Sequence, residues 1–145
     1  MLNIKNVIFF CVTIFSTLSV FATEPNISKK NHAEYRQAGN FIFISSLPPT
    51  DPVSGQAPKE AEDQVNQVFA NLYALVKKLG VDMKDIVKVT VYVDNRDNIM
   101  PLVDKVMDKY FTEEPYAART PVTTTFGSKP YVISIDAIVY HETKT

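Results

Sequence analysis

Hydrophobic positions recur along this chain with two different periods, which predict where its helices and strands lie. Over residues 59–79 the apolar side chains fall every three or four positions, which predicts an amphipathic helix that ends at Gly80. The same spacing predicts a second helix over residues 101–111, opened by a proline. Residues 86–93 alternate valines with other side chains, and this pattern predicts a central strand whose valines share one face.

Further β-prone runs lie near both ends of the chain. Residues 35–37 and 40–45 predict an opening hairpin, whose second strand is apolar on both faces and therefore needs cover on both. Residues 47–58 contain four prolines and predict a rigid loop. Residues 116–137 predict a second hairpin of two antiparallel strands, with Arg119 at one end.

The order of these elements is β-β-α-β-α-β-β, which predicts an α+β domain with two helices packed on one face of a mixed sheet. Residues 94–97 predict a charged turn before the second helix. Strand alternation places Ile133 and Ile135 on one face of the last strand, and Ser134 and Asp136 on the other. Ser134 and Asp136 are therefore expected to point the same way.

The first 22 residues are typical of a secretory signal peptide. Lys5 precedes an apolar stretch from Val7 to Phe21, and Ala22 offers a small residue at a cleavage point. A retained membrane anchor is the alternative, but hydroxyl side chains interrupt the stretch and it is short for a span. We expect residues 1–22 to be a signal peptide, 23–32 a flexible lead-in and 33–145 a single domain. The mature protein would then be periplasmic or secreted, with no membrane attachment.

Cleavage would also limit the chemistry of the mature chain. The only cysteine, Cys11, lies in the signal, so a disulfide or thiolate site is excluded. The net charge changes from −1 to −2 when Lys5 is lost, which argues against nucleic acid as a partner. His32 and His141 lie at opposite ends of the domain, so the sequence supports no metal site, and no motif calls for a cofactor.

Arg119 is the first candidate for a binding residue. Its planar guanidinium carries five N–H donors and can hold a carboxylate or phosphate through two parallel hydrogen bonds, as lysine cannot. A surface or interfacial arginine paired with an acidic side chain is the other interpretation. On residue chemistry alone both stay open.

Four separated segments together resemble the RidA/YjgF family, small trimeric enamine/imine deaminases formerly described as L-PSP endoribonucleases. Residues 118–122 resemble the family's P-A-R-[ST]-x-V, and residues 35–38 resemble the Y-S-Q-A of its N-terminal motif. Residues 45–55 resemble its S-G-Q-x-P-x-[DN]-P-x-[ST]-G loop, and residues 85–93 its D-[IV]-V-K-x-T-V-[FY]-[VL] strand. The four occur in the family's order and at its spacing.

This resemblance implies a barrel-like homotrimer with ligand sites in the clefts between subunits. It implies hydrolysis of reactive 2-enamine/2-imine acids to 2-oxo acids and ammonia, without a cofactor. Arg119 would hold the substrate carboxylate, Tyr35 would line the pocket from a neighbouring subunit, and Ser45 and Ser46 would help to shape it. Asp104 stands where many relatives carry an asparagine and is a further candidate.

Two departures from the family pattern bear on catalysis. Ala33 and Glu34 replace the Gly-Pro before the tyrosine, and Ser134 replaces a glutamate thought to activate the attacking water. Serine can hold a water molecule but is not a base near neutral pH, although Asp136 on the same face could partly substitute. Ser134 is thus a catalytic candidate beside Arg119. A non-catalytic trimer that binds small carboxylates, or protects other molecules, is the alternative, and an endoribonuclease the third.

Overall fold

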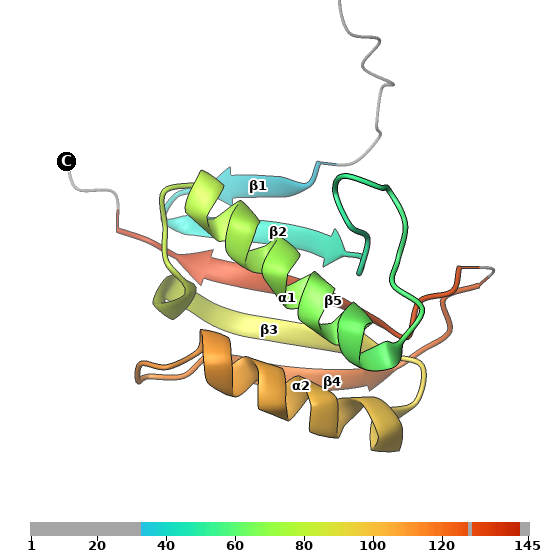
Figure 1. The fold of residues 1–145 in the computed structure, drawn as a ribbon. Coiled ribbons are helices and arrows are strands. Elements are labelled where there is room, and N and C mark those ends of the chain that lie inside the picture. The colour runs from blue at the N-terminus through green and yellow to red at the C-terminus, as the bar shows by residue number, and fades with distance from the viewer. Residues whose placement is uncertain (1–32, 128, 143–145) are drawn as a thin grey trace, which may run out of the picture. The chain divides into compact units, whose positions relative to one another are not determined.

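The computed structural model describes residues 33–127 and 129–142, which form a five-stranded mixed sheet with two helices on one face (Figure 1). The predicted α+β fold class is therefore confirmed. The predicted signal peptide and lead-in, residues 1–32, lie outside the described residues. The strands are β1 (Tyr35–Ala38), β2 (Phe41–Leu47), β3 (Ile86–Val93), β4 (Ala118–Thr123) and β5 (Ile133–Tyr140), and the helices are α1 (Ala61–Lys78), α2 (Arg96–Tyr110) and the short 3₁₀ helix η1 (Met83–Asp85).

The strands lie in the order β1-β2-β5-β3-β4, and this order corrects one prediction. Residues 116–137 do not form a hairpin, because β3 lies between β4 and β5. β4 runs parallel to β3, with α2 as the crossover, whereas every other pairing is antiparallel. Residues 124–132 are long enough to step past one strand. The β-propensity of two runs that flank a turn does not show whether another strand, here β3, lies between them in the sheet.

The second helix also differs from its prediction. It begins at Arg96, so most of the expected turn at residues 94–97 belongs to the helix or its cap. The side chain of Asn95 accepts a hydrogen bond from the backbone N–H of Asn98 at 3.1 Å, as an N-cap does. Pro101 lies inside the helix, and the capping asparagine determines where the helix starts.

The core lies between the helices and the sheet face that they cover. Leu72 and Phe69 of α1 are fully buried there, together with Val89, Val91 and Ile135 of the central strands. The predicted sharing of one face by the valines of β3 was wrong at one position, because Val87 is 44% exposed whereas Val89, Val91 and Val93 are buried. A bulge between Ile86 and Lys88 inserts one residue, so Ile86 takes the buried position.

Gln64 is a polar side chain within this core and is only 2% exposed. Its amide nitrogen donates hydrogen bonds to the carbonyl oxygens of Pro58 at 2.9 Å and Pro130 at 2.8 Å. Its amide oxygen accepts one from the backbone N–H of Val132 at 2.9 Å. This side chain joins the loop before α1 to the segment that enters β5.

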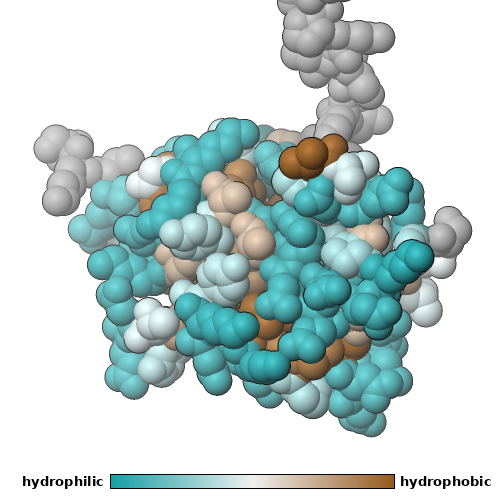
Figure 2. All heavy atoms as spheres, viewed as in Figure 1, coloured by the Kyte–Doolittle hydropathy of each residue, from teal (hydrophilic) through white to brown (hydrophobic). Residues whose placement is uncertain are grey.

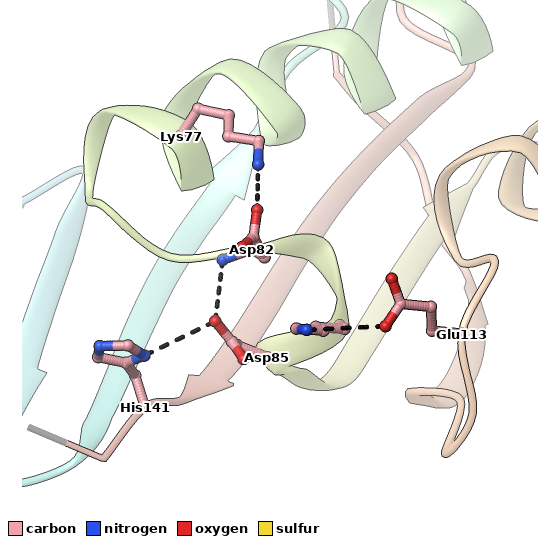
Figure 3. A network of polar contacts seen from close by, with 6 residues as sticks. Lys77, Asp82, Asp85, Glu113 and His141 are labelled. Atoms are coloured by element: carbon pink, nitrogen blue, oxygen red, sulfur yellow. Dashed lines mark hydrogen bonds and ion pairs between the residues drawn. The ribbon is translucent and has the colours of Figure 1, made fainter.

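A polar network fastens the connection between α1 and β3 (Figure 3). Gly80 ends α1 with φ of 74°, as predicted, and η1 follows. Asp85 accepts a hydrogen bond from the backbone N–H of Asp82 at 2.9 Å, and Lys77 forms an ion pair with the Asp82 side chain. The N–H donors of Lys77 stabilise the ionised carboxylate and lower the pKa of Asp82.

The two faces of the sheet differ in character. The face that carries the helices presents mainly hydrophilic residues to solvent (Figure 2). The opposite face, here called the open face, carries Phe41 and Phe43, which are 42% and 46% exposed. The ring of Phe41 contacts that of Tyr140 edge-on, with centroids 5.2 Å apart. Among the described residues no helix is long and apolar enough to cross a membrane.

Candidate active site

Arg119 lies on β4, an edge strand of the sheet, on the side that the helices cover. It is in register with Val89 of β3, which is fully buried beneath the helices. Residues in register on neighbouring strands project to the same face, so the Arg119 side chain is directed toward α2. The βαβ unit of β3, α2 and β4 therefore places the arginine against its own crossover helix.

Two side chains of α2 contact the Arg119 guanidinium. Its Nη1 donates a hydrogen bond to Oδ1 of Asp104, and the same nitrogen lies 3.7 Å from the Met107 sulfur. The Arg119 side chain is 33% exposed and that of Asp104 57%, so solvent screens this ion pair. Arg119 is therefore paired with an acid within one chain, and its role as a binding residue stays a prediction that its partial accessibility permits.

The guanidinium faces a cavity of about 630 Å³ between α2, β4 and the segment that connects them. A cavity of this size admits a small carboxylic acid with room for water. Hydrophobic and polar side chains share its lining. They are Asp104, Met107, Asp108, Phe111, Thr112, Tyr116, Ala117 and Arg119.

Ser134 and Ser46 lie together on the open face. The hydroxyl of Ser46 donates a hydrogen bond to the Ser134 oxygen at 3.0 Å, and Ser134 is 7% exposed. A bulge in β2 between Ile44 and Leu47 brings Ser46 to this position. Because Ser134 alternates with the buried Ile133 and Ile135, it projects away from the helices.

Asp136 lies on the same face as Ser134, as the alternation predicted. Its Oδ2 accepts a hydrogen bond from the hydroxyl of Tyr92 at 2.8 Å. This hydrogen bond, with burial and the negative charge of the carboxylate, raises the pKa of Tyr92. The pairing with Tyr92 gives Asp136 a fixed position beside Ser134.

Within one chain these residues do not form a single site with Arg119. Ser134 is separated from Arg119 by β3 and lies on the opposite face of the sheet. Tyr35 of β1 is 40% exposed at the other edge of the sheet, and Ser45 lies on neighbouring β2. Four inter-strand steps separate β1 from β4, about 19 Å at the usual spacing. A site that combines Tyr35 with Arg119 requires a second copy of the chain, so these roles stay predictions.

Sequence reasoning missed several residues of the cavity. Asp108 and Tyr116 line it, and neither was a candidate. Asp104, Met107, Asp108 and Phe111 recur at three- and four-residue intervals, so they follow one stripe along α2 to its C-cap residue, Phe111. This spacing in the sequence could have identified Asp108 as a neighbour of Asp104 on the same side of the helix. In residues 33–127 and 129–142 no group of three or more His, Cys, Asp or Glu side chains is placed to hold a metal ion.

The model of the Endoribonuclease L-PSP family matches residues 23–141. The chain belongs to this family, also called RidA/YjgF. A RutC family protein of Pyrococcus horikoshii is 36% identical over 107 residues, 73% of this chain and 83% of the relative. The 2-iminobutanoate/2-iminopropanoate deaminase of Escherichia coli is 33% identical over 102 residues, 69% of this chain and 79% of the relative.

A solved structure confirms the RidA fold. Escherichia coli TdcF, crystallised with bound serine, superposes with a TM-score of 0.70 at 24% identity. The match covers 78% of this chain and 90% of TdcF.

Proposed function

We propose that this protein hydrolyses 2-imino acids to 2-oxo acids and ammonia. The observation that carries the proposal is the position of Arg119, whose guanidinium borders a cavity large enough for a small carboxylate. Family membership supports it, since relatives about one-third identical are named 2-iminobutanoate/2-iminopropanoate deaminases. The serine bound to TdcF is a ligand of the same size class.

In the proposed reaction the arginine fixes the substrate and water supplies the oxygen. The water oxygen forms a bond with the iminium carbon while the C=N π electrons move to nitrogen. One proton of this water passes to the nitrogen, and an oxygen lone pair then forms the C=O bond as the C–N bond breaks. The remaining hydroxyl proton leaves with the ammonia as ammonium, and the 2-oxo acid remains. An iminium is already electrophilic, so orientation of substrate and water can supply much of the acceleration without a strong base.

Ser134 has a limited role in this scheme. Its oxygen accepts a hydrogen bond from Ser46, which leaves its own hydrogen for donation to a water molecule. It can orient that water but cannot remove a proton from it near neutral pH. Substrate and water would meet only where a neighbouring subunit brings its open face or β1 edge to the Arg119 cavity.

We therefore include a homotrimer in the proposal. Phe41, Phe43 and Tyr140 on the open face supply apolar surface for contact between subunits. Tyr35 would reach Arg119 from the next subunit. Export to the periplasm or the exterior also remains part of the proposal, and it depends on residues 1–22.

The test is ammonia release from freshly generated 2-iminobutanoate. Arg119→Ala should lower kcat/KM by about 100-fold through loss of orientation, and Arg119→Lys should recover only part of it. Arg96→Ala, which removes an exposed arginine from the start of α2, is the matched control and should keep full activity. A parent protein with no acceleration over buffer would refute the proposal.

The second candidate is a non-catalytic carboxylate-binding protein, and the serine at position 134 favours it. Ser134→Glu separates the two. If the parent is inactive and this variant gains hydrolysis, the natural protein binds imino acids without converting them. If both are inactive while the parent binds 2-oxobutanoate through Arg119, carboxylate binding alone is its function.

A further inference from the structure

The Arg119 cavity has an unusual balance of charge for an anion site. Its lining contains one guanidinium and two carboxylates, those of Asp104 and Asp108. The two acids are four residues apart on α2 and therefore lie one turn apart on the same face. The cavity thus carries a formal charge of about −1 before any ligand enters. A simple receptor for monoanions would carry a net positive charge.

The guanidinium can still hold a ligand in the presence of Asp104. Both hydrogen bonds that Arg119 makes within the described residues leave from Nη1. The donors on Nη2 and Nε remain, which is enough for a bidentate carboxylate. A ligand carboxylate in that position would lie beside Asp104 across the same guanidinium, and the two anions would repel each other.

We propose that Asp104 and Asp108 select ligands that carry a cationic nitrogen next to their carboxylate, and that they disfavour the corresponding 2-oxo acids. This inference rests on the proposed function and specifies the charge state of the ligand at that site. The nitrogen on the carbon adjoining the carboxylate would face the α2 acids, while the carboxylate engages Arg119. Attraction at the nitrogen then exceeds the repulsion on the carboxylate, because the nitrogen lies nearer the two acids.

The same arrangement would assist turnover. Hydrolysis converts a zwitterionic 2-iminium carboxylate and water into a 2-oxo carboxylate and an ammonium ion, so the organic product loses its positive charge. A carboxylate beside the nitrogen stabilises the protonated iminium, which is the reactive form. After reaction the same carboxylate repels the product. Asp104 is therefore assigned as a specificity-determining residue.

The expected effect follows from Coulomb's law. Asp104 is about half exposed, so the effective dielectric constant lies toward the value of water. One unit charge about 5 Å from another then changes an affinity by about five- to tenfold. In Asp104→Asn the oxo acid should gain this factor. The amino acid should lose a smaller one, because the loss of attraction to its nitrogen is partly cancelled by the loss of repulsion on its carboxylate.

Calorimetry with stable ligands tests the inference. The ligands are 2-aminobutanoate, a zwitterion, and 2-oxobutanoate and 2-hydroxybutanoate, both monoanions, the last with the same tetrahedral carbon as the amino acid. They are titrated into the parent, Asp104→Asn, Asp108→Asn and the double variant. Asp97→Asn is the control, because it removes an acid from the first turn of α2, outside the cavity.

The parent should bind 2-aminobutanoate more tightly than both monoanions. Asp104→Asn should weaken the amino acid and strengthen both monoanions, Asp108→Asn should act the same way, and Asp97→Asn should change neither. The inference is overturned if Asp104→Asn strengthens all three ligands alike, because Asp104 then only competes for Arg119. It is also overturned if the parent shows no preference or binds none of the ligands.

Imine hydrolysis by the same preparations separates this result from the proposed function. A parent that hydrolyses imines without an Asp104-dependent ligand preference retains the activity and refutes the selectivity. A parent that shows the preference but no hydrolysis retains the selectivity and refutes the deaminase.

Discussion

Replacing Gln64 should destabilise this domain more than any single-residue change of similar size on the surface of α1. Gln64→Leu keeps the approximate volume of the side chain but removes three hydrogen bonds, to Pro58, Pro130 and Val132. Each bond contributes about 1 kcal/mol net, and the Gln64 side chain that makes them is itself buried. We expect the free energy of unfolding to fall by about 3 kcal/mol.

That loss is large against a typical total stability of 5–15 kcal/mol. Urea denaturation at fixed protein concentration should therefore show a clearly lower midpoint with an unchanged slope. Gln64→Glu should also be destabilising, because it keeps the acceptor for Val132 but turns a carboxylate oxygen toward the carbonyl groups of Pro58 and Pro130. Its cost should be at least that of the leucine variant at neutral pH.

Asn66→Ala is the matched control. Among residues 33–127 and 129–142 the Asn66 amide bonds only the carbonyl of Glu62 in its own helix, so its removal should change the free energy of unfolding by less than about 0.5 kcal/mol. If Gln64→Leu also stays within about 0.5 kcal/mol of the parent, the three hydrogen bonds do not fasten β5 and the reasoning is wrong.

Two further predictions concern pH and backbone conformation. The pKa of Tyr92 is raised by its hydrogen bond to Asp136, so this pair stabilises the fold fully below the ordinary tyrosine pKa of 10.0 and its contribution is lost as pH rises through the folded pKa. In Tyr92→Phe the free energy of unfolding, measured by urea denaturation, should therefore fall less between neutral and alkaline pH than in the parent. An equal fall in both proteins would contradict this prediction. Gly80→Ala should cost about 1 kcal/mol from backbone strain alone, since φ is 74° and no atom lies within 4 Å of an added Cβ. Thermal unfolding measures it, with Gly80→Asn expected to cost less, and equal melting temperatures for parent and Gly80→Ala would oppose this account.

Much of the fold could be predicted because periodicity reports which side of an element is buried. The faces of β5 and α1 followed from spacing, and Gly80 from its place after the last apolar residue. Strand order could not be predicted, because β-propensity does not say which strands will pair. The bulge that exposes Val87 was equally hidden, since one inserted residue reverses the alternation at that point without changing the composition.

The candidate site was only partly accessible for similar reasons. Arg119 stood out because of its chemistry, and Asp104 through a resemblance. Their contact depends on the parallel register of β3 and β4, which no local pattern reports. Gln64 looked like an ordinary polar residue of a helix, because periodicity does not identify a buried amide with three backbone partners.

The parallel pair of β3 and β4 has a consequence for how this molecule can change over time. Arg119 and Asp104 belong to one continuous segment, residues 86–123, which closes on itself through α2. Ser134 and Ser46 belong to strands outside that segment and project from the other side of the sheet. Substitutions at Ser134 or Ser46 can therefore accumulate in a lineage while Arg119 and Asp104 still bind the ligand. In this architecture the residues that bind a ligand and the residues that act on it can therefore change independently during evolution.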